Sequence, residues 1–511
     1  MAEIENSKDL ISVLWSGADI LRSKMDANEY KDYLLGIVFY KYLSDSFLIK
    51  VYDLLYDEKP ATLKEALEAY KEALEDESAE ELKDQLSEEC HYVMEPELTY
   101  TYFADAARNN SFNREQLQKG FNNIEQSDPI FADLFTDIDL YSNRLGAGDQ
   151  KQSDTVASLI KEIDKADLLN SDAEILGNAY EYLIGQFASE TGKKAGEFYT
   201  PQAVSKILTK IAISGQEDKK GLSVYDPCMG SGSLLLNAKK YASAPEYIKY
   251  YGQEQNTSTY NLARMNMFLH GIVAENQHLR NGDTLDGDWP TGEETDFNMV
   301  LMNPPYSAKW SAAAGFLQDE RFSDYGVLAP KSKADYAFLL HGLYHLKNNG
   351  TMAIVLPHGV LFRGAAEGKI REKLLRSGNI YAVIGLPANL FYNTSIPTCI
   401  IVLKKHRDGR DEHIDEVLTL YSDRKTVEKE SYLASFEDIE KNNFNLNIPR
   451  YVDNFEKEED VDINTLLQDM KKTDDELEQV KGDFVSLLKD LTSPDQNIIF
   501  SLNDLIRKLE G

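Results

Sequence analysis

Residues 226–233 read Asp226-Pro227-Cys228-Met229-Gly230-Ser231-Gly232-Ser233. The apolar run Leu222–Tyr225 directly before them predicts a short buried strand, and residues 234–241 after them predict a helix. Glycines let the backbone amides of such a strand-to-helix loop approach a ligand closely. The stretch therefore predicts a ligand site at the end of a strand, and a Gly-x-Gly loop alone fits any nucleotide binder.

The same alternation of strands and helices continues along the chain. Between residues 221 and 405, short apolar runs alternate with helical stretches, which is typical of a parallel sheet with crossover helices. The other expected strands are Tyr247–Gln253, His278–Arg280, Phe297–Met302, Thr351–Leu356, Ile380–Leu386 and Cys399–Leu403. Because ligands bind at the carboxyl ends of the strands in such sheets, we expect an α/β domain with its site at that edge.

The length of 511 residues predicts more than one domain. Apolar residues recur at helical spacings from residue 9 to about residue 169, which predicts an all-α N-terminal domain over residues 1–169. The α/β domain is expected over 170–455, and an acidic linker with a C-terminal helix over 456–511. This helix has a heptad seam of Leu466, Met470, Thr473, Leu477, Val480, Phe484, Leu487 and Leu491. The seam fits packing on its own domain or on a partner's helix, and the linker favours the partner.

The composition is strongly acidic. The chain has 54 Lys and Arg against 86 Asp and Glu, a net charge of −32, whereas contacts from cations to phosphates normally dominate DNA affinity. A DNA substrate would therefore require a partner with a basic surface. The three cysteines are too few for a disulfide framework or a metal cluster. With no secretory signal and no apolar run of about 20 residues, we expect a soluble cytoplasmic protein without membrane contact.

Two carboxylates follow the next strands. Glu254 lies 22 residues after Gly232 (254 − 232), at the end of a strand, where it is placed to accept hydrogen bonds from both ribose hydroxyls. Asp283 follows the third strand and is placed to accept from an adenine amino group, with a turn carboxylate as the alternative. In the loop directly after the first strand, the expected cofactor contacts are Asp226, Gly230, Ser231 and Gly232.

The sequence Asn303-Pro304-Pro305-Tyr306 follows the strand Phe297–Met302 and suggests a reaction. The lone pair of an exocyclic aromatic amine is delocalised into its ring. The Asn303 amide oxygen and the Pro304 carbonyl are two acceptors that would hold both amine hydrogens and restore the lone pair for attack on a methyl group. Proline stiffens this loop, and Tyr306 would stack on a planar substrate.

These motifs together resemble the modification subunit of type I restriction-modification systems, which are S-adenosylmethionine-dependent amino-methyltransferases with a Rossmann-like domain. The resemblance also includes residues 196–201 and 447–451 and covers nearly the whole chain. It implies methyl transfer to the exocyclic amine of a flipped adenine in DNA. It assigns Phe198, Tyr199, Thr200 and Pro201 to the methionine part of the cofactor, and Phe391 to stacking on the flipped base beside Tyr306.

The resemblance also implies partners. A separate specificity subunit would read the DNA sequence, with two copies of this chain beside it, and a restriction and translocase subunit would complete the assembly. Neither the target sequence nor a preference for hemimethylated DNA is readable from the chain.

Three other functions fit part of the pattern. A protein glutamine amide poses the same chemical problem as an aromatic amine, cytosine also has an exocyclic amine, and a silent scaffold would keep the cofactor loop. The large helical domain argues against the glutamine enzymes, and intact Asn303, Pro304 and Tyr306 argue against the scaffold. Cys228 is expected to pack in the cofactor loop and not to act as a nucleophile. The eight histidines, His345 and His358 among them, show no metal-ligand spacing, so we expect no metal.

Overall fold

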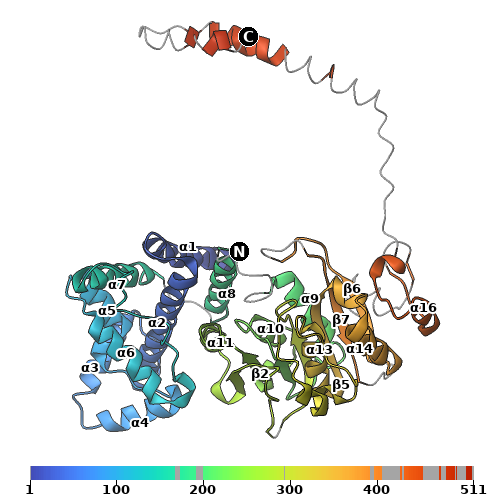
Figure 1. The fold of residues 1–511 in the computed structure, drawn as a ribbon. Helices are drawn as coiled ribbons and strands as arrows, with labels where there is room; N and C mark the ends of the chain where they lie inside the picture. Colours follow the sequence, from blue (N-terminus) through green and yellow to red (C-terminus); the bar gives the residue numbers. More distant parts are fainter. Residues whose placement is uncertain are drawn as a thin grey trace. The chain divides into compact units, whose positions relative to one another are not determined.

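The computed structural model describes residues 2–166, 173–190, 200–292, 294–391, 396–405, 426–427 and 431–452, and then 471–472, 479–489, 491, 502–503 and 505–508. Met1–Val427 with Ser431–Tyr451 form one compact unit, and Glu428–Glu430 with Val452–Gly511 form a second. Within the first unit, Figure 1 shows the N-terminal helices as one group and the sheet with its covering helices as another.

The N-terminal group is all helical, as the apolar spacing predicts. In α1, the residues Leu10, Leu14, Ala18 and Leu21 are buried at spacings of four, four and three. They join a core rich in aromatic rings, in which Phe121 and Phe135 stack at 4.4 Å between ring centroids. The helices are α1 (Ala2–Arg22), α2 (Ala27–Tyr56), α3 (Leu63–Ala73), α4 (Ala79–Cys90), α5 (Tyr100–Arg108), α6 (Arg114–Ser127), α7 (Asp149–Ile163) and α8 (Ala173–Glu190).

The second group is built on a seven-stranded sheet of order β3-β2-β1-β4-β5-β7-β6. All seven expected strands are present, with ends shifted by a few residues. They are β1 (Ser223–Asp226), β2 (Lys249–Glu254), β3 (Gln277–Asn281), β4 (Phe297–Met302), β5 (Leu346–Pro357), β6 (Ile380–Gly385) and β7 (Thr398–Leu403). The chain order reverses between β1 and β4, and ligands of α/β sheets bind at such a switch point.

The sheet is not wholly parallel, contrary to the expectation from the sequence. Strand β7 pairs antiparallel with both β5 and β6. A parallel pair needs a crossover of a dozen or more residues, usually with a helix. The link from β6 to β7 spans residues 386–397 and carries no helix among its described residues, so the strand returns in the opposite direction.

Both faces of the sheet are buried. On β4, Met299 and Leu301 pack with α9 (Gln202–Ile213), while Val300 and Met302 pack with α13 (Asp335–Tyr344), as the alternation of side chains along a strand requires. The result is a three-layer α/β/α domain. Its remaining helices are α10 (Ser233–Asn237), α11 (Thr257–Leu269), α12 (Glu320–Ser323), α14 (Ala365–Arg376) and α16 (Phe436–Lys441).

Helix α11 connects the sheet to the N-terminal helices. Its residues Leu262, Met265 and Leu269 belong to the N-terminal aromatic core. The buried Arg264 guanidinium donates to the carbonyl of Ala132 at 2.7 Å and to that of Ile130 at 2.5 Å. Because α11 directly follows Glu254, these contacts hold the end of β2 against the helical domain.

In the second unit, residues 479–489 are helical. Val485 and Leu488 are buried against Ile506 and Leu502. These two residues do not belong to the predicted heptad seam. Leu466, Met470, Thr473 and Leu477 of the seam lie outside the described residues, whereas the side chains of Val480, Phe484, Leu487 and Leu491 are 49–66% exposed.

Candidate active site at the ends of β1, β2 and β4

The loop after β1 begins at Asp226, which is fully buried. Its Oδ1 accepts a hydrogen bond from the Cys228 amide at 2.9 Å, and its Oδ2 has no hydrogen-bond partner in the part of the chain that the structure describes. Burial, with the nearby Glu254 charge, raises the pKa of Asp226 to about 8. Gly230 and Gly232 have φ of 54° and 81°, a left-handed conformation that side chains disfavour.

Glu254 ends β2 beside this loop. Its Oε2 accepts from the Gly230 amide at 3.2 Å, and its Oε1 accepts from the Asn256 amide at 2.8 Å. Two backbone donors thus fix the carboxylate beside the loop. The Ser231 hydroxyl pairs with that of Ser233 at 3.2 Å, so this side chain stabilises the loop itself.

Asp283 lies near Glu254, because the Gly282 amide donates to the Glu254 carbonyl at 3.0 Å. Its side chain is exposed, and its Oδ1 accepts from the Leu285 amide at 2.9 Å. This bond is that of a turn carboxylate, the alternative that the sequence leaves open. Both oxygens retain acceptor capacity, so the turn also orients the carboxylate.

Asn303 follows β4, the strand that pairs parallel with β1. Its side chain is 3% exposed. Its Nδ2 donates to the Thr200 hydroxyl at 3.0 Å, and its Oδ1 accepts from the Tyr306 hydroxyl at 2.8 Å. Because β1 and β4 are parallel neighbours, Asp226 and Asn303 lie at the same edge of the sheet.

Two aromatic rings meet beside Asn303. The rings of Tyr306 and Phe391 are 5.9 Å apart between centroids and nearly perpendicular at 82°. Burial raises the pKa of Tyr306 above its usual value, so its hydroxyl is a neutral donor. Pro304, the residue after Asn303, is buried as well. The structure thus brings together the expected base-stacking residues and the expected catalytic amide.

The segment expected to cover the cofactor is described in part. Phe198 and Tyr199 lie outside the described residues. Thr200 is buried and contacts Asn303, and Pro201 begins α9, since its carbonyl accepts from the Val204 amide at 2.9 Å. The bond from Asn303 to Thr200 has no signal in the sequence, because 103 positions separate the two residues.

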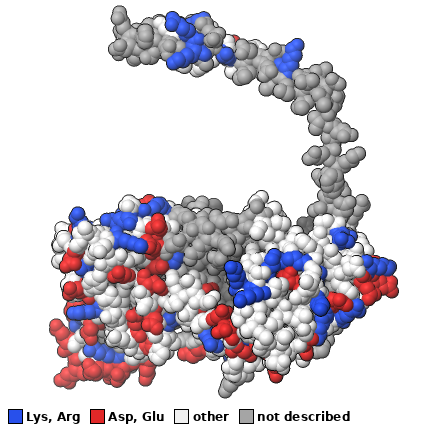
Figure 2. All heavy atoms as spheres, viewed as in Figure 1, with Lys and Arg blue, Asp and Glu red and all other residues white. Residues whose placement is uncertain are grey.

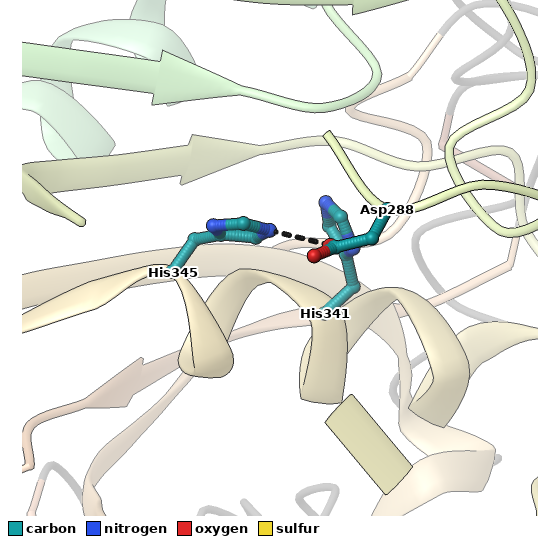
Figure 3. Close-up of side chains that lie close together, drawn as sticks. All are labelled: Asp288, His341 and His345. Carbon is teal, nitrogen blue, oxygen red and sulfur yellow. Dashed lines mark hydrogen bonds and ion pairs between the residues drawn. The ribbon is translucent and has the colours of Figure 1, made fainter. Parts of the chain in front are cut away.

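Asp288, His341 and His345 form a second polar cluster, which the sequence did not predict (Figure 3). Ligand atoms of Asp288, His341 and His345 lie within 4.8 Å of one another. His345 bonds to Asp288 through Nε2 at 2.9 Å, and its Nδ1 faces the Thr295 carbonyl at 2.5 Å. His341 on α13 and His345, the residue after its end, are four positions apart, which is a ligand spacing, so the expectation that the histidines show no such spacing is wrong for this pair.

Hydrogen bonds to protein groups already use both nitrogens of His341. The buried Arg321 Nη1 lies 3.1 Å from its Nδ1, and the Tyr225 hydroxyl lies 2.8 Å from its Nε2. Because a guanidinium only donates, Nδ1 accepts and Nε2 carries the proton. Burial lowers the pKa of His341 well below its usual value, which agrees with a neutral ring. Arg321 is therefore the cation of this cluster, and its charge disfavours a metal ion there.

Arg321 connects the cluster to the cofactor site. Its Nη1 also donates to the Thr284 carbonyl at 3.0 Å, next to Asp283, and the Thr284 hydroxyl donates to the Pro227 carbonyl. Asp319 accepts from the guanidinium at 2.7 Å. The network thus fixes the loop after β3 to the loop after β1.

Comparison with protein families agrees with this geometry. The model of the family described as "N-6 DNA Methylase" matches residues 171–412 and 409–460, and the model described as "HsdM N-terminal domain" matches residues 10–163. The chain belongs to the N-6 DNA methylases, among the methylase subunits of type I restriction-modification systems. It is therefore a methyltransferase. No helix among the described residues of this N-6 DNA methylase is both long and apolar enough to cross a membrane.

Individual relatives of this N-6 DNA methylase cover most of its length. It is 33% identical to the type I restriction enzyme MpnII methylase subunit of Mycoplasma pneumoniae, over 95% of this chain and 96% of the relative. The MjaVIII methylase subunit of Methanocaldococcus jannaschii is 30% identical over 93% of this chain and 84% of the relative. The crystal structure of a type I methyltransferase subunit from Streptococcus thermophilus is 56% identical, with a TM-score of 0.84, over 88% of this chain and all of that one.

Proposed function

We propose that this chain transfers a methyl group from S-adenosylmethionine to the exocyclic N6 amine of a flipped adenine in DNA. The observation that carries the proposal is the buried Asn303 amide, fixed at the end of β4, whose Oδ1 accepts from the hydroxyl of Tyr306, the ring of which meets that of Phe391. An acceptor beside aromatic surfaces suits an amine on a planar base. Asp226 and Glu254, at the ends of the neighbouring strands β1 and β2, supply the cofactor side of the same edge.

The residues present fit S-adenosylmethionine, which supplies an electrophilic methyl group when bound. The buried Asp226 Oδ2 lacks a partner among the described groups, and a cofactor with two positive charges suits a carboxylate there. The glycines Gly230 and Gly232 give the loop two left-handed turns without a side chain. Glu254 would accept from the ribose hydroxyls and Asp283 from the adenine amino group. Phe198, Tyr199, Thr200 and Pro201 remain proposed cofactor contacts by family resemblance.

The chain's own residues would then prepare the nucleophile. Asn303 Oδ1 and the Pro304 carbonyl accept the two amine hydrogens, which disfavours delocalisation of the nitrogen lone pair into the base. Neither Asn303 nor the Pro304 carbonyl must ionise, and Tyr306 stays neutral. These groups would therefore act without a change in their own protonation. Tyr306 and Phe391 hold the base by stacking, worth ~1–3 kcal/mol for each base.

The charge distribution supports a requirement for partners. Residues 72–89 carry nine Asp and Glu in eighteen positions, and Figure 2 shows acidic side chains gathered over the region of α3 and α4. Flipping a base costs a few kcal/mol and requires a grip on the DNA backbone. We therefore propose a separate specificity subunit flanked by two copies of this chain, with a restriction and translocase subunit in the full assembly. The exposed seam of the C-terminal helix is the proposed contact with the specificity subunit.

Methylome sequencing of a host with and without the chain and its specificity subunit tests the proposal. We expect N6-methyladenine at one sequence motif only when both are present. In vitro, Asn303→Ala should abolish transfer while it retains cofactor affinity. Glu254→Ala should weaken S-adenosylmethionine binding more than tenfold by calorimetry. The substitution removes charge-assisted hydrogen bonds that contribute about 1.5–3 kcal/mol of binding free energy. Methyl transfer by Asn303→Ala at the wild-type rate would contradict the proposal, as would methylation of cytosine or of protein alone.

A further inference from the structure

The Asn303 amide is hydrogen-bonded at both ends, and the two ends differ in chemistry. Thr200 Oγ1 lies at the Nδ2 end at 3.0 Å, and the Tyr306 hydroxyl lies at the Oδ1 end at 2.8 Å. Asn303 and Thr200 are 3% and 7% exposed, so water does not readily replace either partner. An amide that rotates by half a turn would present Nδ2, a donor, to the substrate amine. Two donors cannot pair, so the amide orientation decides whether the site can hold the amine.

Thr200 is well placed to fix that orientation. It precedes Pro201, and a residue before proline is restricted to extended backbone. Pro201 in turn begins α9, whose Val204 and Leu208 are fully buried in the same core as Met299 and Leu301 of β4. Asn303 directly follows β4. The two partners of the hydrogen bond are therefore carried by elements that pack against each other.

We propose that Thr200 is a positioning residue for the methyl transfer: its hydroxyl accepts from Asn303 Nδ2 and so keeps Oδ1 turned toward the substrate amine. This inference rests on the proposed function and goes beyond the cofactor role that the resemblance gives this residue. The substrate amine only donates, so it needs Oδ1 at its end, and the Thr200 hydroxyl then accepts from Nδ2 at the other end. A valine at this position would have a similar shape and no acceptor, and Nδ2 would be buried without a partner.

The test uses the complex with its specificity subunit, unmethylated host DNA and labelled S-adenosylmethionine at saturating concentration. Thr200→Val should transfer methyl groups at least tenfold more slowly in a single turnover at saturating cofactor, because saturation overcomes the loss of a cofactor contact but not a misplaced Asn303 amide. Thr200→Ser, which restores the hydroxyl, should recover the rate to within threefold. Thr209→Val is the matched control: this buried hydroxyl of α9 bonds to the Ser205 carbonyl at 2.9 Å, away from Asn303, and its loss should leave the rate unchanged.

The other possible outcomes would contradict either the role of Thr200 or the proposed function. A wild-type rate for Thr200→Val would overturn the inference, as would a slow rate that Thr200→Ser does not recover. A rate restored by more cofactor, with weaker cofactor binding, would make Thr200 a cofactor contact instead. If wild-type complex transfers no methyl group to adenine, the proposed function fails and this inference falls with it.

Discussion

The Tyr306 hydroxyl donates a 2.8 Å hydrogen bond to Oδ1 of Asn303, the atom that the proposed reaction assigns to the substrate amine. The Tyr306 ring meets Phe391 at 5.9 Å and 82°. A base stacked between two rings needs roughly 7 Å between parallel planes, twice the usual carbon–carbon contact distance. In this structure the two rings therefore leave no room for a base between them, and the Tyr306 hydroxyl occupies one of the two acceptor positions of Oδ1.

Removal of this hydroxyl should make base capture easier. Tyr306→Phe keeps the ring for stacking and frees Oδ1, so we expect a larger flipped fraction than wild type and a transfer rate of at least a third of wild type. Tyr306→Ala should instead lose ~1–3 kcal/mol of stacking. Fluorescence of 2-aminopurine at the target adenine measures flipping. If Tyr306→Phe were as impaired as Tyr306→Ala, the hydroxyl would act in the reaction itself.

The sequence predicts the elements of this site better than their contacts. The strands that carry Asp226, Glu254 and Asn303 are found because apolar runs end in polar residues, a local pattern. The bond from Asn303 to Thr200 and the network of Arg321 with His341 join residues that are not neighbours in the chain, so no local spacing predicts these contacts. The antiparallel direction of β7 could not be predicted for a similar reason, because the direction of a strand depends on its connection and not on its own residues.

Asp226 should make stability depend on pH. Its pKa is about 8 in the folded chain and about 3.9 in an unfolded one, so between these values the folded state binds the extra proton. The free energy of unfolding therefore falls as pH rises through this window, by at most about 1.4 kcal/mol per pH unit. Asp226→Asn keeps an acceptor for the Cys228 amide and removes the titration.

Without cofactor, we expect the melting temperature of Asp226→Asn minus that of wild type to increase from pH 5.5 to pH 8. Above pH 8.5 this difference should change little. The exposed Asp286 offers a matched control, since Asp286→Asn should leave the pH profile of wild type unchanged. A constant difference between Asp226→Asn and wild type across this range would show that Asp226 does not titrate there.

Arg321 should matter for both stability and cofactor binding. Its side chain is 1% exposed, and Arg321→Lys keeps the charge but cannot span His341, the Thr284 carbonyl and Asp319 at once. Each buried group left without its partner costs about 1–3 kcal/mol. We expect a clear loss of stability in urea and weaker S-adenosylmethionine binding, because the Asp283 loop loosens. Arg108→Lys, at an exposed ion pair with Asp105, should change neither quantity, and the same small effect at Arg321 would contradict the positioning role.

Two lysines beside the active site should contact DNA phosphates. Backbone bonds from Trp310 to Lys331 at 3.1 Å and from Ala334 to Ala308 at 2.9 Å bring Lys309 and Lys331 onto one ridge after the Asn303 loop. Both side chains are exposed, and neither has an ion-pair partner within the described ranges.

Replacement of each lysine by alanine should weaken DNA binding by the complex. The slope of log K against log salt should become shallower by ~0.9 for each phosphate that the variant no longer neutralises. Lys64→Ala, in the acidic helical domain, is the control and should leave the slope unchanged. If the slope stayed the same in Lys309→Ala and Lys331→Ala, this ridge would not lie on the DNA.

The described part of the C-terminal seam is exposed while its neighbouring face is covered. Val480, Phe484 and Leu487 share one stripe, because spacings of four and three return to the same side of a helix, and the exposed Leu491 lies beyond the described helix 479–489. The side chains that pack within the tail, Val485 and Leu488, lie on the adjacent face. The packing described within the tail therefore leaves the stripe exposed.

This separation permits a test that leaves the tail folded. Phe484→Glu with Leu487→Glu adds charge to side chains that are 49% and 66% exposed, so the stability and the cofactor affinity of the chain should not change. A seam that is buried against helices of the specificity subunit does not tolerate two carboxylates. We therefore expect size-exclusion chromatography to show no complex, and DNA methylation to be lost as well. Ser486→Glu adds a carboxylate on the opposite side of the helix and should assemble normally. An intact, active complex with both carboxylates on the stripe would place the specificity subunit on another surface of the chain.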